Sequence, residues 1–217
     1  MLSVFVKRSL HGRDHNGPGS RLLDPDEVLT RANDDLIAAG LTECHFVTAL
    51  YALYDETTRV LRWARAGAPY PILLRNGQSP QRLPGNGPLL GVLPQAKFEV
   101  IELQLRPGDT ILFHTDGLEA LLSHEEDAIH HSAVDTDWIS RFRGASAGEI
   151  MRGIENALDN VKRTAAQHDD VTIAKLSVDQ STPNQCSQPR QGDASQDSRT
   201  LPTPYRTFQL CEAESTI

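Results

Sequence analysis

The chain has 217 residues, which is enough for one domain with a substantial hydrophobic core, and its formal net charge is −8. This acidic balance argues against nucleic acid or an anionic membrane surface as the main partner. The longest nearly unbroken apolar run, 46–54, is far shorter than the roughly 20 residues that a membrane-spanning helix needs. Three scattered cysteines form neither a disulfide framework nor a zinc pattern. We therefore expect a cytoplasmic protein with no membrane span and no nucleic-acid partner.

The composition changes after Val178. Only nine of the 38 residues in 180–217 are apolar, and Ser, Thr, Pro, Gln, Asn and Gly dominate the remainder. Such a segment buries too little apolar surface to offset the entropy of ordering it. We therefore predict a folded domain over 1–179 and a disordered polar tail over 180–217, in which 205–210 is the most apolar stretch.

The first elements in chain order are helical. Residues 1–10 have the apolar spacing of the end of a helix, and a Gly-rich polar loop is predicted over 11–21. A second helix begins after Asp24, because Pro25 suits the first helical position and Glu27 can complete a capping box. Gly40 is the predicted end of this helix.

The middle of the chain reads as a series of strands. Residues 46–54 are apolar on both faces, which is typical of a central buried strand. Further strands are predicted over 60–66, 72–75, 98–105, 111–114 and 171–178, and a capped helix is predicted to start near Ser146. Consecutive strands bracketed by helices indicate an α+β layered fold rather than alternating βαβ units.

Two acidic pairs stand next to apolar strands. Asp116-Gly117 directly follows the strand 111–114, and Asp169-Asp170 directly precedes the strand 171–178. A carboxylate beside a buried strand is costly unless it is paired or bound to a metal, and oxygen ligands suit Mg²⁺ or Mn²⁺. Such ions can activate a water for attack on a phosphoester. The alternatives are an ordinary turn at Asp116-Gly117 and a solvated loop at Asp169-Asp170, and periodicity does not show that the two pairs meet.

Six short segments, in order, carry a family resemblance. They are Phe46–Ala49, Ala66–Pro71, Gly87–Gly91, Leu105–Asp109, Thr115–Ala120 and His168–Thr172. The series resembles the metal-dependent protein serine/threonine phosphatases of the PPM family. Within that family it is most similar to the bacterial branch named after stage II sporulation protein E, which regulates sigma factors. The resemblance extends over residues 1–178.

The resemblance implies a sandwich of two mainly antiparallel sheets flanked by helices, with a binuclear Mn²⁺ or Mg²⁺ centre. It implies that Asp116 and Asp169 are metal ligands, that Gly117 keeps the backbone close to the site, and that Asp170 orients the loop. It also implies that a metal-activated water hydrolyses phosphoserine or phosphothreonine without a phosphoenzyme. The implied substrate is a phosphorylated regulatory protein of the anti-sigma-factor-antagonist type.

One family motif, Gly-Asp followed by Gly-His-Gly, is not found in this sequence. By resemblance it belongs upstream of the helix that 1–10 complete, so we expect a phosphatase domain without its N-terminal third and without the bridging aspartate. Three hypotheses follow: a phosphatase domain, a non-catalytic binding or regulatory module with a phosphatase-like surface, or an incomplete chain with exposed, aggregation-prone sheet edges. The His-rich and acidic segment 124–131 could bind a metal, but it also reads as a solvated flap.

Overall fold

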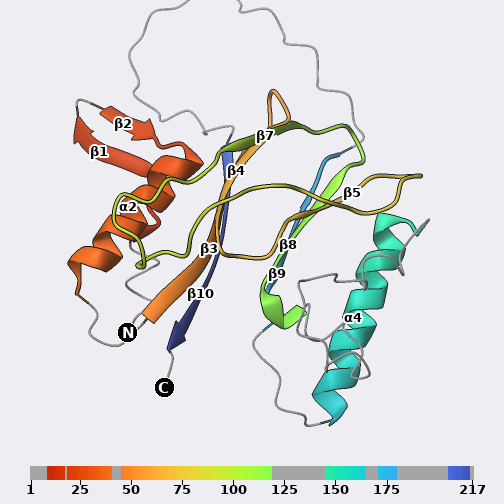
Figure 1. The fold of residues 1–217 in the computed structure, drawn as a ribbon. Coiled ribbons are helices and arrows are strands. Elements are labelled where there is room, and N and C mark those ends of the chain that lie inside the picture. The colour runs from red at the N-terminus through yellow and green to blue at the C-terminus, as the bar shows by residue number, and fades with distance from the viewer. Residues whose placement is uncertain are drawn as a thin grey trace, which may run out of the picture.

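Two four-stranded sheets lie against each other, with one helix outside each of them (Figure 1). The computed structural model describes residues 9–17, 19–40, 45–118, 145–164, 171–179 and 205–215. Among these residues the order of layers is helix α2 (Pro25–Ala38), the first sheet, the second sheet and helix α4 (Ala147–Thr164). This arrangement confirms the predicted α+β fold of two mainly antiparallel sheets flanked by helices.

The strands of both sheets are antiparallel to their neighbours. The first sheet has the order β10 (Tyr205–Ser215), β3 (His45–Asp55), β4 (Val60–Ala66) and β7 (Ile101–Gln104). The second sheet has the order β6 (Gln81–Arg82), β5 (Ile72–Leu74), β8 (Thr110–His114) and β9 (Ile173–Ser177). Each predicted strand of the middle region is present, although β7 is shorter than predicted.

Helix α2 begins and ends where its capping residues predict. The Glu27 carboxylate accepts a hydrogen bond from the Asp24 backbone amide at 2.9 Å, and Pro25 is the first helical residue. The guanidinium of Arg21 and this amide lower the pKa of Glu27 to about 2. The chain leaves the helix through Gly40, whose φ of 56° lies in the left-handed region that glycine adopts without strain.

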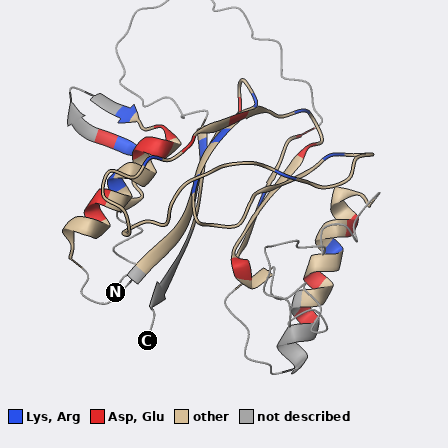
Figure 2. Cartoon of the chain, in the orientation of Figure 1, with Lys and Arg blue, Asp and Glu red and all other residues tan. Residues whose placement is uncertain are grey.

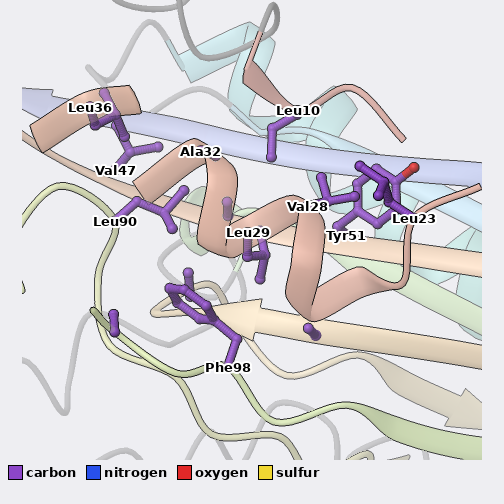
Figure 3. Packing of buried hydrophobic residues seen from close by; sticks show 14 of the residues in the cluster. Leu10, Leu23, Val28, Leu29, Ala32, Leu36, Val47, Tyr51, Leu90 and Phe98 are labelled. Carbon is purple, nitrogen blue, oxygen red and sulfur yellow. The ribbon is translucent and has the colours of Figure 1, made fainter. Parts of the chain in front are cut away.

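The apolar face of α2 covers the first sheet (Figure 3). Val28, Leu29, Ala32 and Leu36 are all buried against side chains of β3 and β4. The helix also buries one polar residue, Asn33. Its side-chain amide donates to the Leu93 carbonyl at 3.0 Å and accepts from the Gly91 backbone amide at 3.0 Å. This helix therefore holds both the sheet and the loop around residues 91–93.

Two further clusters complete the core. Between the sheets, Leu50, Trp63, Ile111 and Phe113 are at most 1% exposed. Between the second sheet and α4, the buried residues are Ile72, Leu74, Leu112, Leu118, Ile150 and Ile154. β8 therefore contributes buried side chains to both clusters and is an inner strand of the second sheet.

The predicted loop over 11–21 is in fact a hairpin of β1 (Arg13–Gly17) and β2 (Gly19–Leu22), so the prediction is wrong there. The residues of this two-stranded ribbon are mostly polar, so its sequence lacks the alternation of apolar and polar residues from which strands are predicted. Leu23 anchors its base, since it is buried and its amide donates to the Gly12 carbonyl at 2.9 Å. The helix predicted over 1–10 lies mostly outside the described residues.

The predicted tail also differs from the structure. Residues 205–215 form β10, which pairs with all eleven residues of β3, from Tyr205 opposite Asp55 to Ser215 opposite His45. The prediction of disorder over 180–217 is therefore wrong for this last part, because a strand needs only a sheet edge to satisfy its backbone groups. Residues 180–204 lie outside the described part of the chain.

Charged residues are interspersed over the described elements. Figure 2 shows Lys and Arg next to Asp and Glu along α2 and near the strand ends. No helix in the described part of the chain is both long and apolar enough to cross a membrane.

In one ion pair among the described residues, the aspartate side chain is buried. Arg75, just after β5, forms two hydrogen bonds to Asp109, just before β8, at 2.8 and 2.6 Å. The Asp109 side chain is 2% exposed and also accepts from the Arg106 amide at 2.9 Å. Burial acts to raise the pKa of Asp109, but the guanidinium and the amide outweigh it and hold this pKa below its ordinary value.

We predict that Arg75→Met lowers the free energy of unfolding by about 3 kcal/mol at pH 7, because it leaves a buried carboxylate without its partner. The Arg75→Met/Asp109→Leu double variant should recover most of this loss. The matched control is Arg21→Met, which removes the same side chain from an exposed pair and should cost about 0–1 kcal/mol. Urea denaturation measures all three.

The pH dependence has a definite sign. Since the pKa of Asp109 is lowered by folding, the pair stabilises the protein above the ordinary value of 3.8 and this contribution is lost as the pH falls. The difference between wild type and Arg75→Met should therefore shrink below that pH. A difference that stays constant on acidification would contradict the assignment.

Candidate metal-binding site

Asp116 is the one exposed residue in an otherwise buried run. Residues 111–115, 117 and 118 are all buried, and Asp116 alone among 111–118 is exposed. Phe113 is held between the sheets, and Leu118 is held against α4. The Leu118 amide donates to the Thr115 carbonyl at 3.2 Å, which turns the chain into one helical turn after β8. The packing on both sides of Asp116 therefore fixes the backbone that carries its carboxylate.

The segment that precedes β9 lies beside this turn. β8 and β9 are antiparallel neighbours, with His114 opposite Ile173, so the end of one strand meets the beginning of the other. Thr115 and Thr172 extend this pairing by two hydrogen bonds. The Thr115 amide donates to the Thr172 carbonyl at 3.1 Å, and the Thr172 amide donates to the Thr115 hydroxyl oxygen at 2.8 Å.

The predicted site residues are only partly described. Asp116 and the buried Gly117 lie at the end of β8, as the sequence predicts. Asp169 and Asp170 lie outside the described residues, as does the His-rich segment 124–131. The described chain resumes at Val171, next to the Thr115–Thr172 link. Within the described ranges no three His, Cys, Asp or Glu side chains gather in a way that could hold a metal ion.

His114 is a core residue in this structure. Its side chain is almost completely buried, and its Nδ1 atom lies 3.1 Å from the Thr115 carbonyl oxygen. Burial lowers the pKa of His114, so the ring is neutral near pH 7. His114 is therefore a packed core residue in this structure.

The donor chemistry at this sheet end fits a hard divalent cation. Asp116 supplies an exposed carboxylate at this sheet end. Asp169 and Asp170, which the sequence also predicts for this site, lie outside the described residues. Carboxylate oxygens are the ligands that Mg²⁺ and Mn²⁺ prefer. The exposed carboxylate of Asp116 therefore fits the cofactor that the family resemblance implies.

Sequence reasoning missed the role of Thr115. This side chain is 4% exposed, and its hydroxyl oxygen satisfies a backbone amide of the other acidic segment. A threonine between an apolar strand and Asp-Gly was visible in the sequence, but its partner is 57 residues away. Only the strand pairing identifies that partner.

We predict that Thr115→Val lowers the free energy of unfolding by about 1–3 kcal/mol, because it keeps the side-chain shape but leaves the Thr172 amide unsatisfied. It should also weaken Mn²⁺ binding about tenfold, as loss of a supporting group around a metal site does. Denaturation and calorimetry measure the two effects.

Thr172→Val is the matched control. Both hydrogen bonds of Thr172 to Thr115 use its backbone, so removal of its exposed hydroxyl should leave them intact. Equal losses in the two variants would show that the Thr115 hydroxyl does not hold the two segments together.

Comparison with known proteins matches this chain to a family. The model of the stage II sporulation protein E (SpoIIE) family matches residues 5–179. Protein IcfG from Synechocystis is 22% identical over 168 residues, which cover 77% of this chain. The chain spans 26% of the length of that relative.

Two solved structures share the fold. The PP2C domain of SiaA from Pseudomonas aeruginosa is 20% identical, with a TM-score of 0.58 over 81% of this chain and 67% of that one. The RsbU and RsbW domains of a Mycobacterium tuberculosis protein are 25% identical to this chain, with a TM-score of 0.52. The match covers 73% of this chain and 43% of that one. The chain described here therefore belongs to the SpoIIE family and has the fold of its PPM-type phosphatase domains.

Proposed function

We propose that this chain is a metal-dependent protein serine/threonine phosphatase domain that uses Asp116 and Asp169 to hold Mn²⁺ or Mg²⁺. Its substrate is a phosphorylated regulatory protein of the anti-sigma-factor-antagonist type. The family match over residues 5–179 supports the reaction class. The observation that carries the site is the Thr115–Thr172 link, which ties the segment after β8 to the segment before β9.

The link matters because metal ligation requires carboxylates from both segments at one point. Asp116 follows Thr115 directly, and Asp169 is three residues before Thr172. Two hydrogen bonds hold Thr115 next to Thr172. Only a short stretch of chain therefore separates each aspartate from this contact. A spacing of one and three residues leaves the two carboxylates within reach of a shared cation, and Asp170 is available to orient the loop.

The chain's own residues have distinct tasks in this proposal. Asp116 and Asp169 bind the cation, which when bound supplies a water of lowered pKa for attack on phosphorus. Gly117, buried behind Asp116, lets the backbone turn close to the site. Thr115 positions both segments through its hydroxyl oxygen and its amide.

Family membership and the exposure of the site support the proposed substrate class. The carboxylate of Asp116 lies at the surface, at the end of the second sheet, rather than in a described enclosed cavity. An exposed centre suits a phosphorylated side chain presented on a protein surface better than a small metabolite, which needs a pocket around it.

We predict that Asp116→Asn and Asp169→Asn each reduce Mn²⁺-dependent phosphate release from a phosphoserine protein to background, because a neutral amide is a poor ligand for a hard cation. Asp170→Asn should retain more activity than either. Phosphate release and Mn²⁺ calorimetry on the same preparations are the measurements.

Asp35→Asn serves as the control, because this exposed aspartate lies on α2, on the other side of the first sheet. It should leave both readouts unchanged. Folded wild-type protein that binds no Mn²⁺ at millimolar concentration would instead favour a non-catalytic phosphatase-like module. Wild-type activity in Asp116→Asn would reject the assigned ligand.

A further inference from the structure

A pocket of about 260 Å³ lies on the α2 side of the first sheet. Its walls come from the segment that leads into β1, from β3 and from β10. β10 contributes Tyr205, Thr207 and Gln209, which are every second residue and so lie on one face of that strand. The family match ends at residue 179, so one wall of this pocket is built from residues outside the match.

Tyr51 of β3 brings a buried hydroxyl group to this pocket. The side chain is fully buried, and its hydroxyl oxygen has no hydrogen-bond partner within the described part of the chain. Figure 3 shows this oxygen at the edge of the apolar cluster. Burial raises the pKa of the hydroxyl, so the group keeps its proton at neutral pH and is a donor. A buried donor without an acceptor is unfavourable, and it marks a position where an acceptor from outside the chain would bind.

Two neighbours place the Tyr51 hydroxyl among the lining residues. A Cβ atom at Gly12 would lie 1.8 Å from the hydroxyl oxygen, so a glycine is needed there to leave room for it. The Thr207 hydroxyl is near enough to act on the pKa of Tyr51, in opposition to burial, although the two groups do not meet in hydrogen-bond geometry. Gly12 and Thr207 both line the pocket, one from each wall. The unpartnered hydroxyl is therefore directed at the pocket.

The charge around the pocket favours an anion. Arg13 lines it, and the positive charge of Arg13 also acts to lower the pKa of Tyr51, so the field of the guanidinium reaches the hydroxyl. No acidic side chain lines the pocket in the ranges that the structure describes. The residue after Arg13, Asp14, pairs with Arg31 of α2 at 3.6 Å. A guanidinium and hydroxyl donors without a lining carboxylate are the groups that bind an oxyanion.

We propose that this pocket binds an oxyanion of phosphate type, held by the Arg13 guanidinium and by the hydroxyls of Tyr51 and Thr207. Free phosphate and a small phosphomonoester share this chemistry, and the volume of the pocket suits either. The pocket is separate from the candidate metal site, because Asp116 follows β8 of the second sheet. The site therefore goes beyond the proposed function, and it is independent of whether the chain is a phosphatase.

Titration of the full-length chain in EDTA tests the site, with amide signals in nuclear magnetic resonance as the readout. The probes are inorganic phosphate, O-phosphoserine and, at equal ionic strength, chloride. We expect at least one phosphate probe to shift the amide signals of Gly12, Arg13 and Thr207 saturably, and the tighter probe identifies which of the two forms the pocket prefers. Equal shifts with chloride would overturn the proposal, as would shifts confined to 116–118, which would place the anion at the candidate metal site.

Substitutions in the pocket make the test specific. Tyr51→Phe should weaken phosphate binding about tenfold, because it removes one hydrogen bond to a charged group. It should not lower the melting temperature, since the hydroxyl has no partner in the free protein. Arg13→Gln should weaken binding at least as much and reduce its dependence on salt.

Tyr54→Phe is the matched control, because this buried tyrosine of β3 packs between the sheets and does not line the pocket. It should bind phosphate like the wild type. If Arg13→Gln impairs folding, Thr207→Val tests the opposite wall at an exposed position. Unchanged affinity in both Tyr51→Phe and the variant of the other wall or of Arg13 would overturn the proposal, and so would the lack of a saturable shift with either phosphate probe.

Discussion

The antiparallel pairing of β8 with β9 is the constraint on which the candidate site depends. It brings together the end of β8 and the beginning of β9. Thr115 and Thr172, which are 57 residues apart in the sequence, extend it by two hydrogen bonds. Without this pairing, Asp116 would be an exposed aspartate in an ordinary turn. With it, Asp116 stands beside the chain segment that leads to the second acidic pair.

The layers of the fold restrain β8 from both sides. Phe113 is covered by the first sheet, including Phe208 of β10, while Leu112 and Leu118 are covered by α4. Consecutive residues of the strand thus point into different clusters, as the two-residue period of a strand requires. The packing of α4 and of the first sheet, including β10, against β8 thus fixes the position of the Asp116 carboxylate.

Local signals in the sequence predicted the elements that depend on local chemistry. Pro25 and Glu27 marked the start of α2, and the apolar run 46–54 marked β3. The hairpin β1–β2 and the strand β10 were missed, because polar strands are stabilised by the edge they join and not by their own pattern. The resemblance indicated Asp116 and Asp169, but no periodicity could place their segments together, and Thr115 acquires its role only through that pairing.

Paramagnetic line broadening by Mn²⁺ tests the central claim most directly. If one ion is held between the segment after β8 and the segment before β9, then substoichiometric Mn²⁺ should broaden the amide signals of residues 115–118 and 171–173 together. Signals of α2, which lies beyond the first sheet, should remain sharp. Broadening confined to one of the two segments, or spread evenly over the protein, would contradict a shared metal site.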